Sequence, residues 1–361
     1  MHALLFAGGV GQRLWPISRK NTPKQFSPII GSKSSVQLAV ERLLPIIPAI
    51  NIFISTNESY ADIVSTQFPS VPRANFILEP MRRDVGAAAA LSFFKLYKSG
   101  IKGPIMFQWA DNYVRKQEQL QDAINVGREI IKNHSDTIVF FGQIPRFPSE
   151  NLGYIEHGEE IGQVGEMPYY AFRSWVYRPS PETCVRMFNA GNYLWNSGYF
   201  VTTVEFVVSQ YRLLAPELTT IAEEILSYEG TSQAEAKLRE LYPTMPSIHF
   251  DESFLMRLKP HHAVVLKLDL EWTDPGSLYG LKEALQTSKD ANVTQGAVVA
   301  VKTSDSLIRN EEAGKVVSVM GMTGVIVVNT SDALLVIHKD SIRHIGALLE
   351  ELGKQGYPGI L

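Results

Sequence analysis

A glycine-rich turn followed by two fixed cations gathers more phosphate-binding residue types than any other part of the sequence. An apolar run at the N-terminus predicts a buried strand, and Gly8, Gly9 and Gly11 follow it at once. Glycines let the backbone turn tightly and bring its N–H groups against an anion. Arg13 and Lys24 add positive charge shortly afterwards. These residue types and spacings predict a polyphosphate site.

Two common glycine motifs do not fit this turn. A P-loop requires Gly-x4-Gly-Lys-Ser/Thr, and no Lys-Ser or Lys-Thr pair directly follows these glycines. A dinucleotide fingerprint requires a third glycine where this chain has Leu14. An NAD-dependent oxidoreductase therefore stays a distant alternative.

The complete run resembles the signature of sugar-1-phosphate nucleotidyltransferases, Gly-Gly-x-Gly-x-Arg-Leu-x-Pro with a downstream Pro-Lys. With Trp15-Pro16 and Pro23-Lys24-Gln25-Phe26 it is most similar to the mannose-1-phosphate guanylyltransferase branch. The resemblance covers about residues 2–287 and extends weakly into residues 327–336, which look like the family's β-domain repeat. It implies an enzyme that joins a sugar-1-phosphate to an NTP and releases pyrophosphate. Mannose-1-phosphate and GTP, giving GDP-mannose, are the favoured pair.

The chemistry of such a transfer explains which charged residues matter. Attacker and electrophile are both anionic, so the site must supply positive charge and alignment. Mg²⁺ commonly does so, bound by a few carboxylates and by phosphate oxygens. The resemblance assigns the metal to Asp111 and Asp274, and catalysis to Arg13, Lys24 and Asp111. Turn or helix capping by the aspartates, and solvated surface charge for the cations, are the structural alternatives.

The resemblance also implies substrate contacts. The implied nucleotide-binding residues are Gly8, Gly9, Gly11, Arg13, Glu79, Arg83, Gly86 and Asp111. The implied sugar-side residues are Gly153, Tyr154, Arg178 and Asn196, although Asn196 could equally hold a β-turn.

Several positions depart from the family pattern. Residues 84–88 replace Asn-Thr-Ala-Pro-Ala, and Asn112 replaces a histidine. Tyr177 replaces the glutamate of Phe-x-Glu-Lys-Pro, and His249 replaces the aspartate of Pro-Ser-Ile-Asp-Tyr. These changes lie where specificity should reside, whereas the residues expected to perform chemistry are intact. Changed specificity is therefore favoured over lost activity.

Composition limits the class of protein. The chain has 361 residues, 45% of them hydrophobic, which is enough for two domains. A net charge of −3 gives no general basic field for nucleic acid. The single cysteine, Cys184, excludes an internal disulfide. No 18-residue apolar stretch or leader pattern is present, so we expect a cytoplasmic protein without a membrane partner.

Alternating strand and helix patterns over the first 150 residues predict an α/β fold. We expect a doubly wound, mostly parallel, Rossmann-like sheet, with ligands beyond the carboxyl ends of its strands. Antiparallel strands are expected within residues 143–203. The predicted domains are a nucleotidyltransferase domain over residues 1–287 and a small β domain over residues 288–361, closed by a helix over residues 340–354. The family resemblance implies a short left-handed β-helix for the second domain.

Two further hypotheses stay open at this point. The same chemistry could act on a different sugar phosphate or other phosphate acceptor with a different NTP. A non-catalytic nucleotide-sugar sensor is the other hypothesis, although a binding module has little need of a metal pair. The exposed strand edges of the β domain would suit a homodimer.

Overall fold

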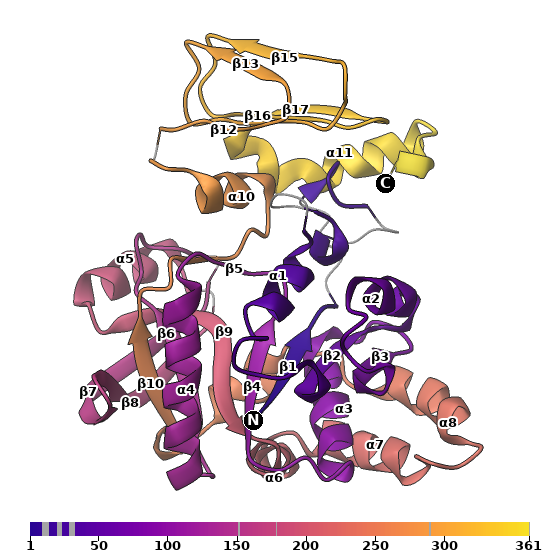
Figure 1. The fold of residues 1–361 in the computed structure, drawn as a ribbon, viewed down its shortest axis with the longest axis vertical. Helices are drawn as coiled ribbons and strands as arrows, with labels where there is room; N and C mark the ends of the chain where they lie inside the picture. Colours follow the sequence, from indigo (N-terminus) through magenta and orange to yellow (C-terminus); the bar gives the residue numbers. More distant parts are fainter. Residues whose placement is uncertain are drawn as a thin grey trace. The chain divides into compact units, whose positions relative to one another are not determined.

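The computed structural model describes residues 1–8, 14–19, 24–28, 33–150, 152–177, 179–288 and 290–360 (Figure 1). The chain forms two compact units, each assembled from separate stretches of the sequence. The first unit comprises Met1–Gly8, Arg42–Trp109 and Arg115–Glu271. The second comprises Gly9–Glu41, Ala110–Val114 and Trp272–Leu361. The chain therefore passes repeatedly between the two units.

A sheet to which the described residues contribute nine strands forms the centre of the first unit. The strands are β1 (His2–Phe6), β2 (Ile52–Asn57), β3 (Phe76–Glu79), β4 (Pro104–Trp109), β6 (Ile138–Gln143), β7 (Tyr154–Val164), β8 (Met167–Val176), β9 (Tyr193–Thr203) and β10 (Ala263–Leu268). Their order is β3-β2-β1-β4-β9-β6-β10-β8-β7. Neighbours among β3, β2, β1 and β4 pair in parallel, as do β6 and β10. β9 and β8 run antiparallel to every strand they pair with. The predicted α/β class with a mostly parallel sheet is confirmed.

Helices cover both faces of this sheet because its strands are apolar on both sides. The helices of the first unit are α2 (Ala61–Gln67), α3 (Asp84–Lys98), α4 (Gln117–Asn133), α5 (Pro181–Ala190), α6 (Val204–Leu214), α7 (Pro216–Ser227), α8 (Ala234–Leu241) and α9 (Phe250–Ser253). Phe107, Phe140 and Phe200 belong to a core cluster shared with α3, α6 and α7. On the opposite face α4 lies against β4, β6 and β9 (Figure 1). Its Gly127 allows this approach, because a Cβ there would lie 2.9 Å from Cγ2 of Val201.

The second unit is built around two small sheets of parallel strands, and the chain winds from one sheet to the other and back. Its elements are α1 (Ser35–Glu41), β5 (Tyr113–Val114), β11 (Trp272–Thr273), α10 (Leu278–Leu285), β12 (Val293–Gln295), β13 (Val298–Val301), β14 (Leu307–Asn310), β15 (Val317–Met320), β16 (Val325–Asn329), β17 (Leu334–His338) and α11 (Ile345–Lys354). β12, β14 and β16 pair in parallel, and β13 pairs in parallel with β15. Each turn of the winding chain thus adds one strand to each of the two sheets. β17 then pairs antiparallel with β16.

Alternate side chains of β14 and β16 are buried in two different clusters. Ile308 and Val327 pack against Val298 and Val317 of the smaller sheet. The intervening residues Leu307, Ile326 and Val328 pack against α10 and α11. The β domain is therefore a wound pair of sheets with apolar side chains between them and helices packed on one outer face.

Short 3-10 helices occupy several connections between these elements. They are Lys24–Phe26, Ala49–Asn51, Glu58–Tyr60, Arg73–Asn75, Tyr242–Thr244, Leu255–Arg257, Pro260–His262, Lys339–His344 and Pro358–Ile360. Within the described ranges, no helix has both the length and the apolar character required to cross a membrane.

Most predicted elements are found, with differences that have physical causes. The helix predicted over residues 84–98 has these bounds, whereas the helix expected over residues 36–47 ends at Glu41. β14 is not predicted because its second half, Arg309-Asn310, is polar. Arg309 is nevertheless buried, donating hydrogen bonds to Oε1 of Glu311 and to the carbonyl of Pro28. The domain division at residue 288 stays a prediction.

Candidate functional site

A lysine and two aspartates meet in the second unit. Nζ of Lys24 lies 2.6 Å from Oδ2 of Asp111 and 3.9 Å from Oδ1 of Asp274. The Lys24 side chain is 9% exposed, compared with 32% for Asp111 and 40% for Asp274. A nearly buried cation thus faces two carboxylates that remain accessible to a ligand.

A two-stranded ribbon brings the two aspartates together although they are far apart in the sequence. Thr273 of β11 pairs with Tyr113 of β5 in antiparallel register. Asp111 stands two residues before Tyr113, and Asp274 directly follows Thr273. Both aspartates therefore leave the ribbon at the same end. After Asp274 the chain turns into α10, whose first turn is capped by the Ser277 hydroxyl accepting from the Gly280 amide at 3.1 Å.

The donor set at this place suits a hard divalent cation. Mg²⁺ prefers oxygen ligands and is usually held by one or two protein carboxylates together with substrate phosphates and water. Asp111 and Asp274 provide two such carboxylates, and both already contact the positive charge of Lys24. Across the part of the chain that the structure describes, no three His, Cys, Asp or Glu side chains converge as a metal centre. Ligand oxygens would therefore have to complete the coordination here.

Four predicted site residues, Gly9, Gly11, Arg13 and Arg178, lie outside the described residues. Gly8 is described and belongs to the first unit. Its carbonyl accepts a hydrogen bond from Nη2 of Arg82 at 3.2 Å.

Glu79 is a buried carboxyl group at the carboxyl end of β3. Glu79 is 8% exposed, and its Oε2 accepts a hydrogen bond from the Tyr242 hydroxyl at 2.6 Å. A Cβ built on Gly8 would lie 3.8 Å from Oε1, so the other oxygen faces the start of the glycine turn. Burial raises the pKa of Glu79 to about 7, although the Tyr242 hydrogen bond and the charge of Arg82 act in the opposite direction. Tyr242 was missed by sequence reasoning, since no motif surrounds it.

The start of α3 is held against the segment 245–250. Arg83 donates from Nε and Nη2 to the carbonyl of Met245, at 2.9 and 2.6 Å. The amide of Gly86 donates to the carbonyl of Ile248 at 2.9 Å. A Cβ on Gly86 would lie 2.5 Å from that oxygen, so the close approach requires glycine. Both residues therefore position this segment, and their nucleotide contacts stay predictions.

Gly153 and Asn196 lie side by side in the first unit. The backbone N–H of Asn196 donates to the carbonyl of Gly153 at 2.8 Å. The side-chain Oδ1 of Asn196 accepts from the backbone N–H of Gly198 at 2.7 Å. The side-chain oxygen of Asn196 thus does hold a turn. Tyr154 is fully buried, with its hydroxyl accepting from the amide of Ser149 at 2.8 Å. Any contact of Tyr154 with a ligand would therefore have to come from its backbone.

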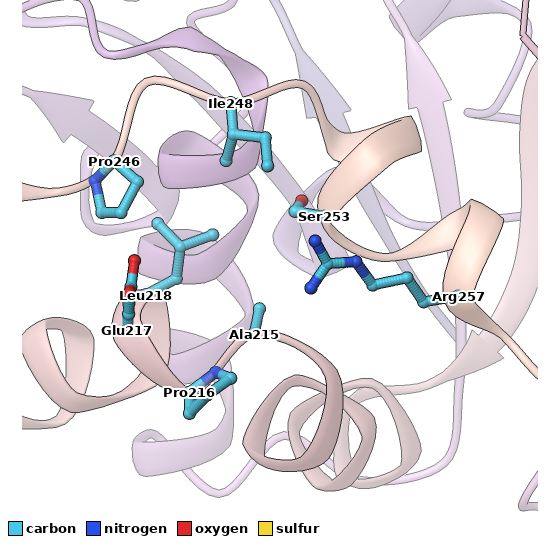
Figure 2. Close-up of a pocket in the computed structure, with 8 residues that line it drawn as sticks. All are labelled: Ala215, Pro216, Glu217, Leu218, Pro246, Ile248, Ser253 and Arg257. Atoms are coloured by element: carbon cyan, nitrogen blue, oxygen red, sulfur yellow. The ribbon is translucent and has the colours of Figure 1, made fainter.

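The first unit also contains a pocket of about 240 Å³ (Figure 2). Figure 2 shows its lining side chains coming from segments 215–218, 246–248 and 253–257. Nη1 of Arg257 donates to the carbonyl of Leu214 at 2.7 Å, so part of this cation is already engaged. None of the predicted site residues lines this pocket, which borders the segment that covers α3.

Comparisons with known proteins find relatives that match nearly the whole chain. Residues 2–291 match the family model described as Nucleotidyl transferase, and residues 296–352 match the MannoseP isomerase/GMP-like beta-helix domain. The chain is 30% identical to mannose-1-phosphate guanylyltransferase 2 of Escherichia coli O157:H7, with 98% of this chain and 73% of that protein covered. It is 28% identical to mannose-1-phosphate guanylyltransferase RfbM of Salmonella typhimurium, with 97% and 72% covered. The crystal structure of mannose-1-phosphate geranyltransferase from Thermus thermophilus superposes with a TM-score of 0.85 at 26% identity, covering 98% of this chain and 99% of that one.

Proposed function

This chain belongs to the nucleotidyl transferase family and is a sugar-1-phosphate nucleotidyltransferase, and we propose that it joins mannose-1-phosphate to GTP, giving GDP-mannose and pyrophosphate. The observation that carries the proposed chemistry is the convergence of Lys24 with Asp111 and Asp274. The relatives from Escherichia coli and Salmonella typhimurium are named for this substrate pair, which supports the choice of sugar and base.

The proposed reaction is an in-line displacement at phosphorus. A phosphate oxygen of the sugar-1-phosphate forms a bond to the α-phosphorus of the NTP, and the bond to pyrophosphate breaks. Lys24 would neutralise charge on the triphosphate, and its nearly buried position keeps that charge fixed in place. Asp111 and Asp274 would hold Mg²⁺. When bound, this ion supplies further positive charge and alignment to the phosphates.

We also propose that Glu79, in its ionised form, contacts the base. An ionised carboxylate only accepts hydrogen bonds, and guanine offers N–H donors from N1 and from its 2-amino group on one edge. Tyr242 occupies Oε2 of Glu79, whereas Oε1 faces Gly8 at the start of the predicted polyphosphate loop. We therefore assign the reading of the base to Oε1. Donors from guanine would favour the ionised form of this carboxyl group.

Asn196 and Gly153, both in the first unit, are the residues that we propose to contact the sugar. Oδ1 of Asn196 is engaged in its turn, so the Nδ2 hydrogens are the part that could donate to a sugar oxygen. Gly153 lies directly against it, since a Cβ on Gly153 would stand 3.5 Å from the Cβ of Asn196.

The test is pyrophosphate release in the presence of Mg²⁺, with the four NTPs screened against mannose-, glucose- and N-acetylglucosamine-1-phosphate. We expect the highest kcat/KM with GTP and mannose-1-phosphate. Asp111→Asn and Asp274→Asn should each lower turnover by about two to three orders of magnitude, because a catalytic metal contributes several kcal/mol. Asp62→Asn is the matched control, since the Asp62 side chain is almost completely exposed.

Three outcomes would contradict the proposal. Pyrophosphate release with a different sugar phosphate or NTP would contradict the proposed substrates, although the proposed chemistry would stand. Wild-type turnover in both asparagine variants would remove the carboxylate pair from the mechanism. Nucleotide binding by the wild-type protein without any turnover would favour a non-catalytic sensor.

A further inference from the structure

Three positions at which the sequence departs from the family motifs are neighbours in the first unit. Nδ1 of His249 lies 3.2 Å from Oδ1 of Asp84. The rings of His249 and Tyr177 have their centroids 5.8 Å apart, with an interplanar angle of 45°. The residues come from separate places: the start of α3, the residue after β8 and the residue before α9. The three departures from the family motifs therefore form one cluster around His249.

The histidine and the aspartate are held in a defined orientation. Asp84 has φ of 67°, a backbone conformation uncommon for residues other than glycine. Its Oδ1 accepts a hydrogen bond from the amide of Val85 at 2.8 Å, which fixes the carboxylate beside Nδ1 of His249. Nε2 of His249 has no hydrogen-bond partner among the residues that the structure describes. The side chains remain open, at 43% exposure for His249 and 28% for Asp84.

This cluster adjoins the residues of the first unit that are proposed to contact the sugar. Val176, which precedes Tyr177, pairs with Tyr154 across β7 and β8. A Cβ on Gly153 would lie 3.7 Å from the carbonyl oxygen of Val176 and 3.5 Å from the Cβ of Asn196. Asn196, Gly153 and Val176 therefore form a continuous path to Tyr177, all within one unit.

We propose that Asp84, His249 and Tyr177 form a subsite that reads the ring hydroxyls of the sugar phosphate. The inference rests on the proposed function and deepens it. Nδ1 of His249 faces the carboxylate of Asp84 at 3.2 Å, so Nε2 is the ring nitrogen that would bond a sugar hydroxyl. The ring of Tyr177 offers an apolar surface to the C–H face of the sugar. His249 thereby supplies a hydrogen-bonding group, where the family pattern has carboxylates at positions 177 and 249.

The experiment compares kcat/KM for mannose-1-phosphate and glucose-1-phosphate, which are epimers at C2, in wild type and variants. His249→Ala should change the ratio of the two kcat/KM values at least tenfold, because a site built to bond a hydroxyl loses discrimination when its hydrogen-bonding group is removed. The KM for the sugar phosphate should rise while the KM for the NTP stays constant. His249→Gln, which keeps an acceptor oxygen, should recover part of the ratio. The control is His261→Ala, since His261 is exposed and lies outside the cluster.

The outcomes separate a recognition role from a purely structural one. If His249 only fastened the segment 245–250 to α3, both sugars would lose activity equally and the ratio would stay at its wild-type value, which would overturn the inference. If the wild-type protein releases no pyrophosphate with any pair, the proposed function fails. Binding of mannose-1-phosphate by wild type and His249→Ala is then measured by saturation-transfer NMR. Weaker binding in the variant would support the subsite, and equal binding would overturn it.

Discussion

Replacing Glu79 by glutamine should remove a pH-dependent cost to folding. The carboxyl is buried in the folded protein, where its pKa is raised by burial to about 7 from an ordinary value of 4.5. Between these values the unfolded chain has lost the proton and the folded chain still holds it. The unfolded state then binds fewer protons, so the free energy of unfolding falls as pH rises through this window. Glu79→Gln has no proton to lose and lacks this contribution.

The size of the effect follows from the two pKa values. Each pKa unit corresponds to about 1.4 kcal/mol, so the change from 4.5 to about 7 amounts to about 3 kcal/mol. Glutamine can still accept a hydrogen bond from Tyr242, so packing and this bond are largely kept. The free energy of unfolding of Glu79→Gln should therefore exceed that of the wild type by a margin that grows as pH rises. The margin should increase by about 3 kcal/mol from pH 4.5 to pH 8, most of it below pH 7.

The assay is urea unfolding at constant ionic strength, followed by tryptophan fluorescence and circular dichroism at several pH values from 4.5 to 8. Glu118→Gln is the control, because Glu118 is exposed on α4 and should leave the wild-type pH dependence unchanged. Tyr242→Phe removes the hydrogen bond that lowers the pKa of Glu79, so this pKa should rise further. The free energy of unfolding of the Tyr242→Phe variant should therefore keep falling to a higher pH than that of the wild type. Parallel pH curves for the wild type and Glu79→Gln would refute the reasoning, since they would mean that the carboxyl ionises equally in both states.

Three further substitutions test the packing and the ion pairing inside each unit. Gly198→Ala should destabilise the protein by about 2 to 4 kcal/mol, because Gly198 has φ of 74° and a Cβ there would overlap the indole of Trp109. Gly191→Ala, at φ of 76° but with no heavy atom within 4 Å of its Cβ, should lose only about 1 to 2 kcal/mol in the same urea titration, and equal losses would contradict the packing argument. Asp305→Asn should cost about 3 to 5 kcal/mol, because it leaves the fully buried ammonium group of Lys282 without its carboxylate. A thermal unfolding midpoint equal to that of the wild type would show that this ion pair does not stabilise the second unit.

Local patterns in the sequence were enough to predict the class of fold and the chemistry. Hydrophobic periodicity is a local property of the chain, so the alternating strands and helices and the bounds of helix 84–98 could be predicted from neighbouring residues. The glycine turn, Lys24 and the two aspartates could be assigned by resemblance, because each lies in a short motif. The family follows from these motifs, and the match over residues 2–291 confirms it.

Which distant residues meet became known only from the folded chain. The β5–β11 ribbon places Asp111 and Asp274 at one end, and the fold brings Tyr242 to Glu79. These contacts depend on strand pairing and packing between segments far apart in the chain, which no local pattern records. For the same reason the sequence showed the departures at positions 84, 177 and 249 as three separate losses, whereas in the folded protein they are neighbours. A side chain acquires its partners, its burial and its pKa from residues that are close in space.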